Sequence, residues 1–309
     1  FKTPVNKIRL FEHGAPGSQN LKLTRKYYTE DMPDGRVKHI VQNITDPDIV
    51  PYIPDGIGNS TDRQRIPAVL IIPGGAFRRL VYNFEGEDVA KWLNSMGIAA
   101  FVLECRLPSD EHDNAEDVPL IDAMRAMRVI RGRAQEFGID EAKIGVMGFS
   151  AGGFMAALLS TAYESDVYAD YKYKDEYDKL SARPDFAVCS YPVISIDDCI
   201  EAGKRYMSEE QVLERISDGK AKILHKYNPD KLVRPDMPPV FICETDDDRT
   251  TLSENSVGFY MAARKAGVSA ELHIFRTGGH GYGCGDDFAQ TGEWKVLFTK
   301  WIKSIGIIS

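Results

Sequence analysis

The sequence predicts an α/β fold in which a mostly parallel, doubly wound sheet is preceded by antiparallel N-terminal strands. From Ala68 onward, short apolar runs alternate with segments of helical periodicity, which is the pattern of parallel strands joined by crossover helices. Several runs are apolar at successive positions, as strands covered on both faces require. Before them, Leu21–Thr29 and Val37–Thr45 resemble antiparallel strands.

Each element can be placed from its pattern. A Pro-, Gly- and Asp-rich loop is expected over Asp46–Arg65, where turn residues cluster. Three of the expected helices stop at a glycine, which is a common C-terminal cap. The expected parallel strands are Ala68–Ile72, Ala99–Glu104, Lys143–Phe149, Phe186–Pro192, Val240–Cys243 and Ala270–Phe275. The expected helices are Glu85–Met96, Asp117–Phe137, Ser253–Ala266 and Glu293–Ile305, with a further one after Ser150.

We expect a single domain over residues 1–309, interrupted by two insertions at about 161–181 and 195–236. The second is expected to be helical around Glu209–Ile216. Either insertion could wall a substrate cleft or could simply cover the sheet. The first is rich in tyrosine, whose aromatic face and polar tip suit both sugar rings and surface packing. Its tyrosines are Tyr163, Tyr168, Tyr171, Tyr173 and Tyr177.

Composition limits the classes of partner. The 309 residues carry a net charge of −8, which argues against a nucleic-acid partner. No apolar run reaches 18 residues, so no membrane span is expected. The five cysteines have no regular spacing and no H-E-x-x-H pair occurs, so we expect neither a metal nor another cofactor. The compartment stays open between the cytoplasm and a secreted or periplasmic location with a leader outside this sequence, and the oligomeric state is not assigned.

The segment Gly148-Phe149-Ser150-Ala151-Gly152 is the most informative motif. An apolar run precedes it and a run of helix formers follows it. Strand, tight turn and helix form the context in which G-x-S-x-G is a nucleophile elbow. The sequence therefore predicts Ser150 as a nucleophile beside a helix N-terminus, where backbone N–H groups favour developing negative charge.

A serine nucleophile needs a general base, and His280 is the best placed of the six histidines. It lies in a glycine-rich loop between the last expected strand and the last helix, and this loop leaves the same sheet edge as the elbow. The third member is expected after Val240–Cys243, where three aspartates follow each other. We choose Asp248 and keep Asp247 as the alternative, because three like charges cannot all point inward.

An oxyanion hole requires N–H donors that converge on one point. One is expected from Ala151, directly after the nucleophile. The others are expected from Gly75 and Ala76 in the loop Pro73-Gly74-Gly75-Ala76-Phe77, which follows the first parallel strand. This loop is similar to the HGGG loop of lipases and esterases, with proline and alanine as replacements that leave the backbone donors in place.

The chain resembles a known family, the α/β-hydrolases of the acetyl xylan esterase and dienelactone-hydrolase-like group, from about Ile44 onward. The sequence departs from the family pattern at Ala76, in the triple aspartate and at Thr250-Thr251-Leu252. The segments that carry the resemblance are Ile71–Gly75, Glu85–Asn94, Gly97–Leu103, Ile144–Gly153, Arg183–Phe186, Glu271–Phe275 and Gly278–Gly281.

The resemblance implies a serine carboxylesterase that removes short acyl groups, frequently acetyl, from carbohydrates such as acetylated xylan. Small-molecule or oligosaccharide esters are the implied substrates. The absence of a long Met- or Leu-rich lid in the sequence also argues against a lipid-sized acyl group. The alternatives are a serine peptidase or amidase on the same fold, a feruloyl or general carboxylesterase, and a non-catalytic relative that only binds a ligand.

Overall fold

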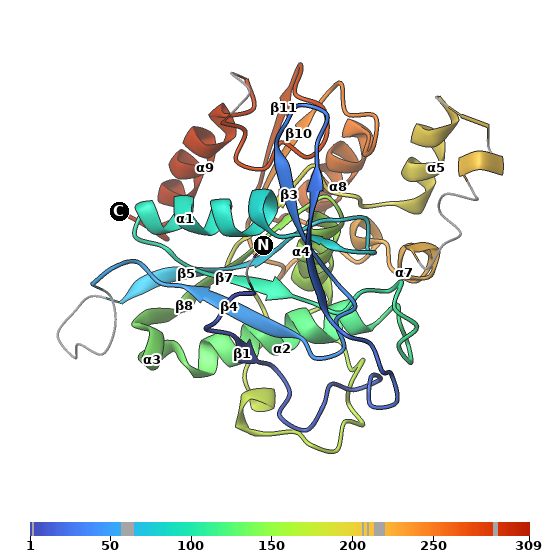
Figure 1. Cartoon of the computed structure of the whole chain (residues 1–309). Coiled ribbons are helices and arrows are strands. Elements are labelled where there is room, and N and C mark those ends of the chain that lie inside the picture. Colours follow the sequence, from blue (N-terminus) through green and yellow to red (C-terminus); the bar gives the residue numbers. More distant parts are fainter. Residues whose placement is uncertain (2, 57–64, 206, 209, 213–219, 287–289) are drawn as a thin grey trace.

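The main sheet has eight strands in the order β1-β4-β7-β5-β8-β9-β10-β11 (Figure 1). The computed structural model describes residues 1, 3–56, 65–205, 207–208, 210–212, 220–286 and 290–309. From β7 to β11 neighbouring strands are parallel, whereas β1 and β4 are antiparallel. The strands are β1 (Ile8–Arg9), β4 (Asp48–Tyr52), β5 (Ile66–Ile72), β7 (Ala99–Glu104), β8 (Ile139–Phe149), β9 (Ala187–Ser190), β10 (Val240–Thr245) and β11 (Ala270–Phe275).

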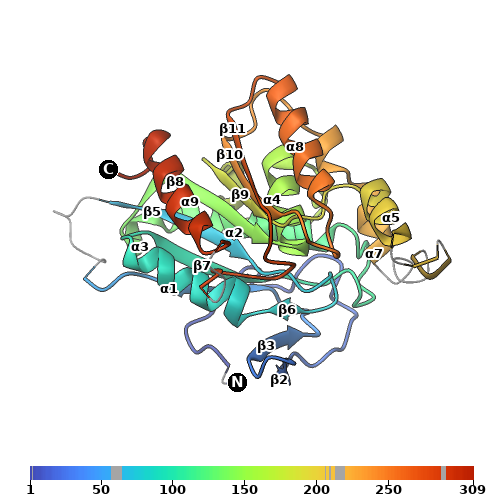
Figure 2. The same cartoon turned by 90° about the horizontal axis from the view of Figure 1, so that it is seen from above.

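Helices cover both faces of this sheet, as the doubly wound prediction requires. Helices α1 (Asp88–Ser95) and α9 (Glu293–Ser304) lie together on one face (Figure 2). Their contact is aromatic, since the Trp92 ring centroid lies 5.0 Å from that of Trp294 and 5.4 Å from that of Phe298. The opposite face carries α2 (Val118–Gly132), α4 (Ala151–Ala162) and α8 (Ser253–Lys265). Further helices are α3 (Ala134–Phe137), α5 (Ile196–Lys204) and α7 (Lys220–Lys226), with the short helical turns η1 (Asn83–Glu87), η2 (Glu176–Lys179) and η3 (Pro229–Lys231).

The N-terminal strands differ from the expectation in their partners. The two expected antiparallel strands exist, as β2 (Lys26–Asp31) and β3 (Val37–Gln42), but they form a separate three-stranded sheet with β6 (Leu80–Val81). The antiparallel strands of the main sheet are β1 and β4, and β4 lies inside the segment that we expected to be a loop. Asp48 and Pro51 resemble turn residues in sequence, yet Asp48 pairs with Arg25 at 2.5 Å. Pro51 lies beyond the two residues of β4 that pair with β1, near the edge of the sheet, where proline is tolerated.

Two helices begin or end differently from their patterns. The expected helix Glu85–Met96 starts with a π-helical turn, η1, before α1. The expected helix Asp117–Phe137 is divided at Arg133 into α2 and α3. The helix expected around Glu209–Ile216 lies largely outside the described residues. Within the described part of the chain, no helix combines the length and the hydropathy needed to cross a membrane.

The tyrosine-rich insertion packs against the N-terminal segment of the chain. The ring centroids of Tyr168 and Tyr171 lie 6.4 and 5.5 Å from that of Phe11, and the Tyr171 hydroxyl donates to the carbonyl of Gly14 at 2.8 Å. These contacts support the packing role for both residues. The side chain of Tyr173, in the same insertion, is 42% exposed, so its ring is accessible to solvent. That the insertion walls a substrate cleft stays a prediction.

Candidate active site

Ser150 stands on a strained turn between β8 and α4. Its backbone has φ +54° and ψ −119°, a conformation that costs a non-glycine residue energy and is held only by surrounding structure. A Cβ at Gly148 would lie 1.9 Å from the carbonyl oxygen of Gly152. The glycines of the motif are therefore required by close backbone packing, and the turn places Ser150 at the N-terminus of α4.

His280 reaches Ser150 from the loop after β11. Its Nε2 lies 2.9 Å from the Ser150 Oγ, which is hydrogen-bond distance for a nucleophile and its base. Gly278, Gly279 and Gly281 have φ of +154°, +63° and +78°, so the loop uses conformations that favour glycine on both sides of the histidine. The glycines therefore allow the loop to turn so that it brings the His280 imidazole to Ser150.

The Asp248 carboxylate lies at hydrogen-bond distance from the second ring nitrogen of His280. The His280 Nδ1 lies 2.6 Å from its Oδ2. Its Oδ1 accepts the backbone N–H groups of Thr250 at 2.7 Å and Thr251 at 3.0 Å. Burial raises the pKa of this carboxyl, but the hydrogen bond and charge of His280 and the two N–H groups outweigh it, so the pKa lies below its usual value. A buried, ionised carboxylate thus faces the histidine.

The neighbouring aspartates are oriented differently. Asp246 and Asp247 are exposed, whereas Asp248 is 2% exposed. The Asp247 carboxylate accepts the backbone N–H of Gly279 at 2.8 Å. It therefore contacts the loop that carries the histidine, but through the main chain. Of the two aspartates that the sequence leaves open, the structure brings Asp248 to the imidazole and Asp247 to its loop.

The expected oxyanion loop passes directly beside the nucleophile. A Cβ at Gly74 would lie 2.9 Å from the Cβ of Ser150. Gly75 and Ala76 both have positive φ, +136° and +59°, and within the described residues their N–H groups make no backbone hydrogen bond. Ala151 begins α4, where the first N–H groups have no partner in the helix. The loop that carries two of the expected donors and the helix N-terminus that carries the third therefore both adjoin Ser150.

Two residues at the site were not expected from the sequence. Glu85, in η1, accepts the N–H of Gly74 at 2.8 Å. Tyr191, directly after β9, is fully buried, and its ring centroid lies 5.0 Å from that of His280. The available signal for Tyr191 was its place at the carboxyl end of a strand, the edge where the site forms. The sequence around Glu85 indicated only that this residue lies in the first turn of an amphipathic helix, so it gave no sign of a role at the site.

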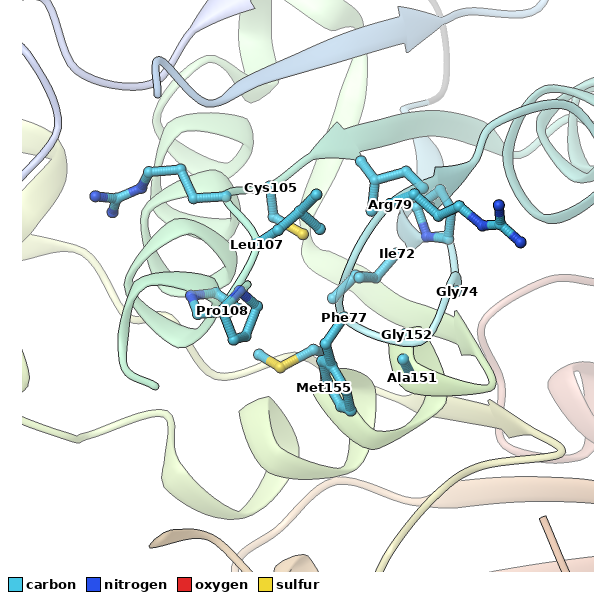
Figure 3. Close-up of a pocket in the computed structure, with 14 residues that line it drawn as sticks. Ile72, Gly74, Phe77, Arg79, Cys105, Leu107, Pro108, Ala151, Gly152 and Met155 are labelled. Carbon is cyan, nitrogen blue, oxygen red and sulfur yellow. The ribbon is translucent and has the colours of Figure 1, made fainter. Parts of the chain in front are cut away.

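A small apolar pocket adjoins the oxyanion loop. Leu107, Pro108 and Met155 gather on one side of it, and the backbone of Gly74 and Ala151 on the other (Figure 3). Its volume is about 10 Å³, roughly the space that one water molecule needs. The lining residues come from the ends of β5 and β7 and from α2 and α4: Ile72, Pro73, Gly74, Phe77, Arg79, Leu80, Cys105, Arg106, Leu107, Pro108, Pro119, Ala151, Gly152 and Met155.

Comparison with known proteins places this fold among the α/β-hydrolases. The chain superimposes on the acetyl ester-xyloside bifunctional hydrolase of Caldicellulosiruptor lactoaceticus with a TM-score of 0.71 and 35% identity, covering 98% of this chain and 97% of that one. It is 31% identical over 240 residues to an acetylxylan esterase of Xylanibacter ruminicola, over 77% of this chain and 45% of that protein. An endo-1,4-beta-xylanase B of Butyrivibrio fibrisolvens is 31% identical over 227 residues, 73% of this chain and 34% of that protein.

The family model BD-FAE matches residues 57–262. The chain therefore belongs to the BD-FAE family, and the predicted fold and the predicted resemblance to acetyl xylan esterase-like α/β-hydrolases are confirmed. The chain spans less than half the length of the two curated relatives that it matches.

Proposed function

We propose that this protein is a serine carboxylesterase that removes short acyl groups, acetyl above all, from carbohydrates such as acetylated xylan. The observation that carries the proposal is the chain of contacts from the Ser150 Oγ to the His280 Nε2 at 2.9 Å and from the His280 Nδ1 to Asp248 at 2.6 Å. A serine, a base and a buried carboxylate in this order are the parts that acyl transfer through a covalent intermediate requires.

The reaction follows from the positions of these groups. Ser150 attacks the ester carbonyl while His280 takes the hydroxyl proton. The N–H groups of Gly75, Ala76 and Ala151 stabilise the oxyanion that forms. His280 then donates its proton to the departing alcohol as the carbon–oxygen bond breaks. A water molecule, deprotonated by His280, then attacks the acyl-enzyme. The bond between the Ser150 Oγ and the acyl carbon breaks, His280 returns the proton to this Oγ, and the carboxylic acid leaves. Asp248 holds the imidazole and stabilises its charged form.

The apolar pocket supports a short acyl group. Because His280 must protonate the leaving alcohol, the alcohol lies on the histidine side of Ser150, and the acyl group points away from it. The pocket lies beside the oxyanion loop and is lined by the ends of β5 and β7 and by α2 and α4. In the sheet, β5 and β7 lie on the opposite side of β8 from β11, whose loop carries His280. A volume of about 10 Å³ matches a methyl group far better than a longer chain.

The carbohydrate part of the substrate is supported by the relatives. One is named an acetylxylan esterase and another an acetyl ester-xyloside bifunctional hydrolase. Both names combine an acetyl ester with a xylose-containing compound, and the second protein is covered almost completely by the alignment. Because one fold serves many substrates, the sugar is tested in its own assay.

The test is an assay of acetate release from acetylated xylo-oligosaccharides, beside p-nitrophenyl acetate, butyrate and ferulate. We expect acetate release from the oligosaccharides and the highest kcat/KM among the aryl esters for acetate. A preference for ferulate would identify a feruloyl esterase. Cleavage of peptide amides in place of esters would identify the amidase alternative. Either result would overturn the substrate proposed here.

A further inference from the structure

Glu85 is a buried carboxyl beside the candidate active site. It is 4% exposed and belongs to η1, a π-helical turn, a feature that often marks functional sites. Gly86 lets this turn approach the sheet, because a Cβ there would lie 3.0 Å from the Val102 Cγ1. Burial holds the pKa of Glu85 above its usual value, and the charge of His280, the Tyr191 hydroxyl and the Gly74 N–H offset this rise only in part. A buried acid is costly unless its oxygens are bonded.

One oxygen of Glu85 holds the oxyanion loop. The N–H of Gly74 donates to the Glu85 Oε2 at 2.8 Å. The fit is tight, since a Cβ at Gly74 would lie 2.7 Å from this oxygen and 2.9 Å from the Ser150 Cβ. Glu85 therefore fixes the residue that directly precedes the two expected loop donors, Gly75 and Ala76.

The other oxygen is linked to the histidine loop through Tyr191. The Tyr191 hydroxyl donates to the Glu85 Oε1 at 2.9 Å and accepts the backbone N–H of Gly283 at 3.0 Å. Gly283 follows His280 by three residues in the same loop. The Tyr191 ring packs edge-on against the His280 ring, with centroids 5.0 Å apart. Glu85 and Tyr191 together thus join the two loops between which the ester carbonyl would lie.

We infer that Glu85 is a positioning residue for ester hydrolysis, which sets the oxyanion loop, through Gly74, at a fixed distance from the His280 loop, through Tyr191. The inference rests on the proposed function. Donors aimed at the oxyanion act only when they are held in place before the reaction, and an error of about 1 Å can cost about 100-fold in rate.

Glutamine cannot replace Glu85 in this arrangement. An amide keeps the size of the side chain but has one acceptor oxygen where two are needed. If the oxygen stays on the Gly74 N–H, the amide nitrogen faces the Tyr191 hydroxyl and leaves its proton without an acceptor. In the flipped orientation the amide nitrogen faces the Gly74 N–H. A buried donor without a partner is destabilising, so one of the two loops loses its fixed position.

The experiment measures kcat and KM for p-nitrophenyl acetate in E85Q, Y191F and the double variant, with enzyme concentration set by fluorophosphonate titration of active sites. Titration removes any contribution from misfolded protein. We expect kcat to fall about 10- to 100-fold with KM within about three-fold, because the lost interactions act on the transition state. The double variant should lose little more than the worse single one, because both act through one chain of contacts.

E87Q is the matched control, because Glu87 belongs to the same turn but pairs with Lys91 at 2.7 Å, and it should keep the wild-type kcat. Wild-type kcat in titrated E85Q and Y191F, or fully additive losses in the double variant, would overturn the inference. Failure of the proposed function gives a different result, since Ser150→Ala would then keep ester hydrolysis. The role of Glu85 is therefore contradicted when Ser150→Ala abolishes ester hydrolysis but E85Q and Y191F keep the wild-type kcat.

Discussion

The two sides of Ser150 differ in polarity. On the triad side, defined by Asp248, Thr251 and His280, polar atoms are joined by hydrogen bonds of 2.6–3.3 Å. On the pocket side, defined by Phe77, Leu107 and Met155, apolar side chains leave a volume of about 10 Å³. In the proposed function, the polar side carries out the reaction and the apolar side selects the acyl group. A substitution on each side should therefore change a different kinetic quantity.

The largest effect is expected from Ser150→Ala, which tests whether Ser150 is the nucleophile. Ser150→Ala removes the nucleophile and leaves the strained turn in place. We expect kcat for p-nitrophenyl acetate to fall by about four to six orders of magnitude, with an unchanged circular dichroism spectrum. A fluorophosphonate should label the wild-type protein at Ser150 and should not label the variant. Labelling at another residue would show that the nucleophile is assigned wrongly.

Asp248→Asn should have the next largest effect. The Oδ1 would still accept the Thr250 and Thr251 N–H groups, so the new amide nitrogen would face the His280 Nδ1. The His280 Nδ1 must then accept a hydrogen bond from the amide, so it carries no proton. The imidazole proton moves to Nε2, where it prevents proton transfer from the Ser150 hydroxyl. We expect kcat to fall about 10³- to 10⁴-fold. A loss of only a few-fold in steady-state assays would remove Asp248 from the triad.

A substitution on the pocket side should change selectivity and leave the chemistry intact. Met155, 2% exposed, lines the pocket. Met155→Ala enlarges it, so the ratio of kcat/KM for butyrate to that for acetate should rise about 10-fold, while acetate hydrolysis stays within a few-fold of wild type. Met261→Ala is the control, because Met261 is 59% exposed on α8. An unchanged ratio in Met155→Ala would place the acyl group elsewhere.

The same comparison explains how much the sequence could predict. Ser150 lies in five consecutive residues whose geometry is local, and His280 lies in a glycine-rich loop, so both could be identified from short patterns. The pocket combines segments around residues 72–80, 105–108, 119 and 151–155, and only packing brings them together. Glu85 was missed for a related reason, since a glutamate in the first turn of an amphipathic helix is normally solvated.

The strand β4 was missed because Asp48 and Pro51 resemble turn residues. Their roles depend on Arg25 and on the end of β1, which lie elsewhere in the sequence. The choice between the aspartates was open because both immediately follow β10 on one loop. Only the conformation of the turn decides which carboxylate points inward, and neighbouring residues of the same type carry no signal for that.

The smallest predicted effect therefore sharpens the comparison between these two aspartates. Asp247 is exposed and accepts only the Gly279 N–H within the described contacts. Asp247→Asn keeps an acceptor oxygen for that N–H, and water can solvate the rest of the side chain. We expect kcat within about three-fold of wild type, measured in parallel with Asp248→Asn under identical conditions. If Asp247→Asn lost activity as severely as Asp248→Asn, the triad acid would not be the carboxylate buried against His280, and the division between a catalytic and a loop-holding aspartate would be wrong.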